Sequence, residues 1–322
     1  MTKTVLVTGI GGNVGQGILR NIISCKYDVK LVGTNTEIVS GGNHLCDVVY
    51  KVPFSTSPRY ISTMQKICTK EHVDLVVPST DYETYYLALA REKLPSVATS
   101  DAKVCYTFLN KYETWKIFSK FSIPFAKTTL PSLYKDEFKG IVVKPIEGRG
   151  SRDIHINPDD PRAFSDDFII QKLYKGKELT TAFYVTKKRE LLGHITFIRS
   201  LSHGTTDRCE VVFDYKKEVE KIIRKMIDSF EIKGSCNIQA IVSKGGRVIP
   251  FEINGRISGT NSIRGQFGFE DVRYTLQEYL FNEDPEKPVI KKGAAVRVLM
   301  DVIYPNTRLD DVRNSSVKNY IF

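Results

Sequence analysis

Apolar and polar residues alternate in short blocks along the first hundred residues, and the blocks predict strands and helices in turn. Each strand is a short run of aliphatic residues that ends at glycine, a polar residue or proline, whereas each helix has apolar residues three or four apart. Strands that alternate with helices pair in parallel, so this part predicts an open, doubly wound sheet. The predicted strands are Thr4–Thr8, Val29–Val32, Val48–Tyr50 and Asp74–Pro78, and the predicted helices are Val14–Ile23, Tyr60–Thr69 and Tyr82–Arg91.

The pattern changes near Asn110, where strands begin to follow one another as hairpins. Consecutive strands joined as hairpins pair antiparallel. The polar tail after Pro305 is expected to be loosely held. The strands predicted here are Gly140–Lys144, Arg152–Ile156, Phe168–Leu173, Leu179–Val185, Leu191–Arg199, Ser235–Ser243, Arg247–Asn254 and Ala294–Val302, with helices over Lys111–Phe121, Lys216–Phe230 and Asp271–Phe281.

Composition narrows the class of protein. Of 322 residues, 41% are apolar and 26% are charged, which is typical of a globular chain. No apolar run approaches the roughly 18 residues that span a bilayer, so we expect no membrane segment. The first residues lead into a buried strand rather than a secretory signal, and the six cysteines include no Cys-x-x-Cys pair. We therefore expect reduced thiols and a cytoplasmic location.

The net charge of +10 bears on the class of ligand. A basic balance suits nucleic acid, anionic surfaces or phosphate ligands. The basic residues are scattered, with no block of five or six, so we expect a solvated surface and a phosphate site rather than a nucleic-acid face.

A glycine turn follows the first predicted strand. Gly9, Gly12 and Gly15 are spaced so that backbone N–H groups could meet a phosphate, as in dinucleotide sites. Tyr112 and Lys116 also have the spacing of the Tyr-x-x-x-Lys pair of short-chain reductases, so an NAD(P)-dependent reductase is one alternative. The second strand lacks the acidic residue that such a site expects, so a tight structural turn is favoured.

The hairpin around Gly245-Gly246 carries the sharpest chemical signal. These glycines suit a two-residue turn, and Gln239 then lies opposite Glu252 with Cβ atoms about 5 Å apart. Asn254 and Arg256 share the face of Glu252 because side chains alternate along a strand. Oxygen side chains gathered in this way can bind a hard cation such as Mg²⁺. A solvated outer face of the hairpin is the alternative.

A second signal is the lysine that ends the buried run Ile141–Lys144. Gly148–Arg152 follow it as a glycine-rich turn. Free N–H groups of such a turn, together with lysine and arginine side chains, form a cradle for an anion. A plain hairpin tip is the alternative for this segment.

Taken together, these motifs resemble the ATP-grasp superfamily. The resemblance covers the chain from its N-terminal Rossmann-like part to about Val302. It is closest to one ATP-grasp unit of the carbamoyl phosphate synthetase large subunit and to stand-alone carboxylate–amine ligases. It implies an α/β chain in which a Rossmann-like parallel sheet is followed by an ATP-grasp fold of two α+β subdomains. The implied units are a Rossmann-like domain (1–109), a small subdomain (110–170), a large subdomain with the metal site (171–305) and a C-terminal tail (306–322).

The resemblance also assigns roles to residues. It implies Mg²⁺ ligands at Gln239, Glu252 and Asn254, with Mn²⁺ as a possible substitute, and catalytic roles for Arg256 and Lys144. Asp81, which follows a strand end at the crevice of the parallel sheet, is a candidate substrate contact together with Arg256. The implied ATP-binding residues are Lys111, Lys144, Gly148, Arg149, Gly150, Ser151, Gln171, Lys172, Leu173 and Glu178.

The activity implied is ATP-dependent ligation of a carboxylate to an amine through an acyl phosphate, which forms a C–N bond and releases ADP and phosphate. The expected partners are small carboxylate and amine substrates, with no nucleic acid and no membrane, and a homodimer is left open. Carbamoyl phosphate synthetase needs two such units, so this chain should not make carbamoyl phosphate alone. A catalytically silent ATP-binding protein is the remaining alternative.

Overall fold

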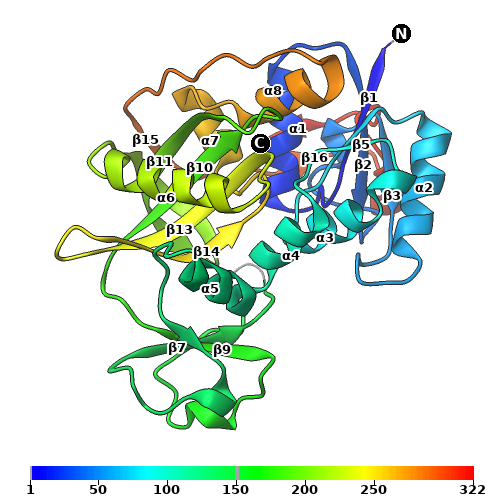
Figure 1. Ribbon diagram of the computed structural model, residues 1–322. Coiled ribbons are helices and arrows are strands. Elements are labelled where there is room, and N and C mark those ends of the chain that lie inside the picture. The colour runs from blue at the N-terminus through cyan, green and yellow to red at the C-terminus, as the bar shows by residue number, and fades with distance from the viewer. Residues whose placement is uncertain (1, 149–151) are drawn as a thin grey trace.

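The N-terminal part of the chain is a parallel sheet covered by helices on both faces. The computed structural model describes residues 2–148 and 152–322 (Figure 1). Five strands lie in the order β3-β2-β1-β4-β5, and helices α1, α2 and α3 connect them. Apolar residues of α1 pack on one face, and those of α2 and α3 pack on the other. The elements are β1 (Lys3–Val7), α1 (Asn13–Ser24), β2 (Val29–Asn35), β3 (Val48–Lys51), α2 (Tyr60–Glu71), β4 (Leu75–Val77), α3 (Asp81–Leu89) and β5 (Ser96–Val97).

Two antiparallel sheets follow. A four-stranded sheet has the order β6-β9-β7-β8, and Figure 1 shows its strands β7 and β9 set apart below the rest of the molecule. A six-stranded sheet has the order β14-β13-β10-β11-β12-β15, and α4, α5 and α6 share a core with it. The elements are α4 (Ala102–Leu109), α5 (Lys111–Lys120), β6 (Thr128–Thr129), β7 (Ile141–Pro145), β8 (His155–Ile156), β9 (Phe168–Lys172), β10 (Gly176–Val185), β11 (Leu191–Ser202), β12 (Thr205–Val211), α6 (Lys216–Ser229), β13 (Gly234–Ser243), β14 (Val248–Asn254) and β15 (Ala294–Val296).

The N-terminal sheet and the large antiparallel sheet are joined by helices near the end of the chain. Helix α7 (Asn261–Arg264) contacts α1, and α8 (Asp271–Leu276) continues into a π-helical turn, Gln277–Phe281. Val272, Leu276 and Leu280 are buried against α1 and the parallel sheet. This shared core confirms the predicted class, a parallel sheet followed by antiparallel sheets, and brings edges of the sheets together.

Several short elements differ from the sequence predictions. The predicted strand over Arg152–Ile156 is limited to β8, and the late strand is limited to the edge strand β15, which pairs with only three residues of β12. Helix α4 and strands β5 and β12 were not predicted, since short runs show too few periods to identify. No helix among the described residues has the length and apolar character needed to cross a bilayer.

The expectation of a loosely held tail is wrong. The buried Asn43 side-chain amide donates to the carbonyls of Val312 (3.4 Å) and Arg313 (3.3 Å). Farther along, β17 (Tyr320–Ile321) pairs with β16 (Val302–Ile303). Backbone pairing and side-chain to backbone hydrogen bonds hold this segment, and they leave no periodic apolar pattern in the sequence.

Candidate active site

A cavity of about 640 Å³ lies where the three sheets approach one another. Strand ends of the parallel sheet contribute Gly9, Asn35 and Ser79 to its wall, and β7 contributes Lys144. Ligands of open parallel sheets bind at the carboxyl ends of the strands, which is the edge that faces this cavity. The predicted site residues that line it are Asp81, Lys111, Lys144, Gly148, Gln171, Lys172, Leu173, Glu178, Gln239, Glu252, Asn254 and Arg256.

The hairpin of β13 and β14 has the predicted pairing but a different turn. The Ser243 N–H donates to the Arg247 carbonyl (3.0 Å), so Lys244–Gly246 form a three-residue loop and the predicted two-residue turn is wrong. That loop alone would shift the pairing by one residue. A β-bulge next to Gln239 adds one residue on β14 and compensates for the shift, so Gln239 pairs with Glu252 as predicted.

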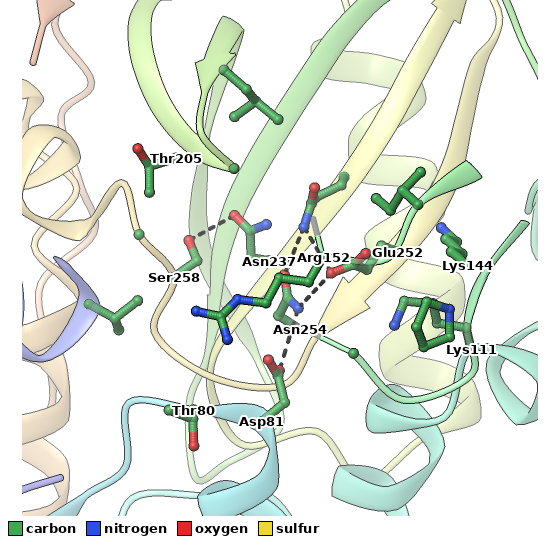
Figure 2. A pocket seen from close by; sticks show the side chains of 18 of the residues that line it. Thr80, Asp81, Lys111, Lys144, Arg152, Thr205, Asn237, Glu252, Asn254 and Ser258 are labelled. Carbon is green, nitrogen blue, oxygen red and sulfur yellow. Dashed lines mark hydrogen bonds between the residues drawn. The ribbon is translucent and has the colours of Figure 1, made fainter. Parts of the chain in front are cut away.

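The three predicted metal ligands contact one another. The Gln239 Nε2 donates to Glu252 Oε1 (3.1 Å) and to Asn254 Oδ1 (3.2 Å). The Asn254 Nδ2 donates to the same Glu252 oxygen (3.2 Å), as Figure 2 shows. One carboxylate and two amides therefore converge on one point of the cavity wall.

This donor set fits a hard divalent cation, with one adjustment. The carboxylate of Glu252 and the amide oxygen of Asn254 are ligands that Mg²⁺ prefers. Gln239 turns its nitrogen toward them, so its amide would have to rotate to offer its oxygen. Elsewhere in the described chain, no group of three or more His, Cys, Asp or Glu side chains is suited to a metal ion.

Two buried lysines lie beside Glu252. Lys144, which is 5% exposed, donates to the Phe251 carbonyl (3.3 Å), and Lys111, the first residue of α5, approaches the Ile146 carbonyl (3.4 Å). Burial lowers the pKa of Lys144 to about 8, even though Glu252 acts in the opposite direction. Two cations in a partly dehydrated wall are suited to phosphate oxygens.

These lysines also keep Glu252 charged. Burial by itself would raise the pKa of Glu252, but Lys111 and Lys144 act to lower it. A hydrogen bond from Asn254 and the charge of Arg256 add to this effect, so the pKa is below its ordinary value. Glu252 is therefore an ionised acceptor at neutral pH.

Asp81 pairs with Arg256 rather than pointing alone into the cavity. The Arg256 Nε and a terminal nitrogen both donate to Asp81 Oδ2, the first at 3.1 Å, and the Asn254 Nδ2 approaches Asp81 Oδ1 (3.4 Å; Figure 2). Asp81 is the first residue of α3, so this contact joins the parallel sheet to β14 and the residues that follow it. Its predicted role as a substrate contact would have to be compatible with this ion pair.

The predicted nucleotide side is described in part. Gly148 and Arg152 line the cavity, whereas Arg149, Gly150 and Ser151 lie outside the described residues. Gln171 is buried at the cavity wall and donates to the Thr128 hydroxyl (3.0 Å), with Lys172 and Leu173 next to it.

Sequence reasoning missed Arg199. Its guanidinium donates twice to Glu178 Oε1 (2.9 and 2.7 Å) and once to Gln239 Oε1 (2.8 Å), and it lines the cavity. The only feature of the sequence that pointed to this residue was an arginine at the end of a predicted strand, Leu191–Arg199. Its register opposite Glu178 depends on the hairpin of β10 and β11, which contains a bulge and has no glycine in its turn.

Of the residues that suggest a reductase, Gly9 and Gly12 line the cavity, but the Tyr112 and Lys116 pair does not join them there. Tyr112 stacks on Trp115 (5.5 Å between ring centroids), Lys116 pairs with Glu113 (2.8 Å), and neither Tyr112 nor Lys116 is among the described cavity-lining residues. A Cβ on Gly15 would lie 2.5 Å from the Gly9 carbonyl, so this glycine is needed for the turn itself.

Comparisons with known proteins agree with this architecture. Residues 108–260 match the family model of the ATP-grasp domain, and residues 5–100 match that of the PylC-like N-terminal domain. Among curated proteins, none matches the sequence.

Similar solved structures include N5-carboxyaminoimidazole synthetase from Staphylococcus aureus complexed with ADP (12% identity, 93% of this chain and 83% of that chain, TM-score 0.76). The L-amino acid ligase from Bacillus licheniformis is also similar (13% identity, 90% and 75% covered, TM-score 0.69). A third is the biotin carboxylase domain of the Hydrogenobacter thermophilus 2-oxoglutarate carboxylase (15% identity, 88% and 72% covered, TM-score 0.67). At these identities the likeness is one of fold.

Proposed function

The chain contains an ATP-grasp domain joined to a PylC-like N-terminal domain, and we propose that it is an ATP-dependent carboxylate–amine ligase. One observation carries this proposal. Two buried lysines, an ionised glutamate and the Asp81–Arg256 pair all line a single cavity between the parallel and antiparallel sheets. Solved structures of the same fold include an amino acid ligase and a synthetase complexed with ADP.

ATP would lie along the antiparallel sheets. Lys111 and Lys144 would contact its phosphates, and Gly148 would lie beside them. Backbone groups of Gln171–Leu173 would meet the adenine, and Glu178 would accept hydrogen bonds from the ribose hydroxyls. All of these residues line the cavity.

A magnesium ion, with manganese as a substitute, would be held by Glu252, Asn254 and a rotated Gln239. Such an ion neutralises the charge of the phosphates during transfer. The residues of the chain supply the rest, because phosphoryl transfer depends on positioning and electrostatic stabilisation more than on covalent help.

The reaction begins when the substrate carboxylate attacks the γ-phosphorus of ATP and ADP leaves. The acyl phosphate has a good leaving group, which a carboxylate lacks. An amine then attacks the acyl carbon, phosphate leaves, and an amide remains. Lys144 and Arg256 would stabilise the transferring phosphoryl group, and the cavity walls would keep water from the acyl phosphate.

A screen of ADP release tests the proposal and identifies the substrates together. Purified protein with ATP and magnesium would be crossed against a library of carboxylates and a library of amines. We expect ADP release that requires one carboxylate and rises when one amine is added. ADP release that never depends on a carboxylate would overturn the ligase assignment.

Glu252→Ala is the matched test of the site. We expect it to reduce ADP release by at least about a hundredfold while the protein stays folded, because the carboxylate at the centre of the donor set is lost. Glu210→Ala, at an exposed position of the same sheet, is the control and should retain wild-type turnover. Wild-type turnover in Glu252→Ala would show that this hairpin is not the reaction centre.

A further inference from the structure

The guanidinium of Arg199 joins two predicted functional side chains. Arg199 on β11 reaches across β10 to β13, where it holds Gln239 Oε1 at 2.8 Å. It also donates twice to Glu178, the predicted ribose contact. The side chain of Arg199 is only 11% exposed, so these contacts form in a largely dehydrated wall of the cavity.

The chemistry of the partners determines which way the Gln239 amide faces. An arginine can only donate hydrogen bonds, and an ionised carboxylate can only accept them. Arg199 therefore selects the oxygen of Gln239, and Glu252 selects its nitrogen, which is the arrangement observed. The Gln239 NH₂ group then donates to both Glu252 Oε1 (3.1 Å) and Asn254 Oδ1 (3.2 Å). It therefore occupies the position from which a cation would contact these two oxygens.

Rotating the amide would create a conflict at its other end. If Gln239 presented its oxygen to a cation, its nitrogen would face the Arg199 guanidinium, and two donors would meet without an acceptor. Arg199 and a metal-facing Gln239 oxygen are therefore incompatible in the arrangement of the structure.

We propose that Arg199 is a positioning residue that keeps the metal-ligand set closed until a nucleotide binds. This inference rests on the proposed function. A bound nucleotide brings ribose hydroxyls, which compete with Arg199 for the Glu178 carboxylate, and phosphate oxygens, which compete with Gln239 for the guanidinium. Released from Arg199, the amide of Gln239 can rotate, and the site then accepts the divalent ion together with the nucleotide.

Manganese binding, measured by electron paramagnetic resonance, tests the proposal without knowledge of the substrates. Wild-type protein should bind Mn²⁺ weakly alone and more tightly with ADP. Arg199→Lys keeps the charge but lacks the planar fork that holds Glu178 and Gln239 together. We expect it to raise the affinity for Mn²⁺ alone by roughly tenfold, the size of one lost charge-assisted hydrogen bond. No gain in Arg199→Lys would overturn the proposal.

A double variant separates this effect from a general loss of positive charge. Arg199→Met should also tighten Mn²⁺ binding, but in a Gln239→Ala background, which has no amide to hold, most of that gain should disappear. An equal gain in both backgrounds would mean that charge alone is responsible, and the positioning role would be rejected. Melting temperatures of all variants would show which of them are folded. If either Arg199→Lys or Arg199→Met fails to fold, the other still measures the effect of Arg199 on the affinity for Mn²⁺ alone.

The proposed function and this inference fail in different ways. If wild-type protein binds neither ADP nor Mn²⁺ with ADP, the nucleotide site itself is wrong. If it binds both, but the Arg199 variants leave the affinity for Mn²⁺ alone unchanged, only the role of Arg199 is wrong.

Discussion

Lys144 carries its charge in a wall from which water is largely excluded. Burial lowers its pKa to about 8, and Lys111 adds to this effect, while Glu252 and Glu178 partly oppose it. Because an unfolded lysine titrates near 10.4, unfolding takes up a proton between about pH 8 and pH 10. The fold therefore becomes more stable as the pH rises through this window, and the charged lysine costs on the order of 3 kcal/mol below it.

A nucleotide should reverse this cost. Phosphate oxygens next to Lys144 favour its charged form, so we expect ADP binding at pH 8.5 to take up protons and to weaken as the pH rises from 7 to 9. Calorimetry in buffers of different ionisation enthalpy measures the uptake. Lys144→Met is the control that should abolish most of it, and an absence of uptake in the wild type would argue against phosphate contact.

At the scale of elements, the hairpin of β13 and β14 shows how two local features determine which side chains meet. A three-residue loop and a bulge on β14 offset each other, and Gln239, Glu252 and Asn254 therefore share one face. The predicted pairing is confirmed although the predicted turn is wrong. Gly245-Gly246 does not specify the length of the turn, because a two-residue turn and a three-residue loop are both compatible with two adjacent glycines.

Gly246 allows a test of this turn. Its φ is 76° and a Cβ there would meet nothing within 4 Å, so Gly246→Ala carries only the cost of the left-handed backbone. We expect a loss of about 1 kcal/mol in the free energy of unfolding, measured with urea. Gly245→Ala, whose φ is not positive, should cost clearly less. Equal costs would mean that the turn has another conformation in solution.

At the scale of the whole molecule, the Asp81–Arg256 ion pair lines the cavity and links the parallel sheet to the large antiparallel sheet. The side chains of Asp81 and Arg256 are 11% and 13% exposed, respectively, and the two residues are 175 positions apart in the sequence. A pair that is this well buried and doubly hydrogen-bonded is expected to couple the N-terminal domain to the strand that carries Glu252 and Asn254.

A double-mutant cycle measures the coupling. Asp81→Ala, Arg256→Ala and the double variant should give an interaction of about 1–3 kcal/mol in unfolding free energy. The exposed pair Lys188–Asp284, with 65% and 76% exposed side chains, is the matched control and should give less than about 1 kcal/mol. Additive losses for Asp81 and Arg256 would show that the two domains are not coupled through this pair.

The sequence by itself determined the order of most strands and helices, the ATP-grasp resemblance, which the family match over residues 108–260 confirms, and the pairing of the adjacent strands that carry Gln239 and Glu252. These follow from hydrophobic periodicity, from ordered motifs and from strands adjacent in the chain, which are local properties. Only the tertiary structure placed Asp81 against Arg256, and Arg199 between Glu178 and Gln239. Such contacts depend on how layers pack and on strand registers altered by bulges, and neither is encoded in the pattern of one segment.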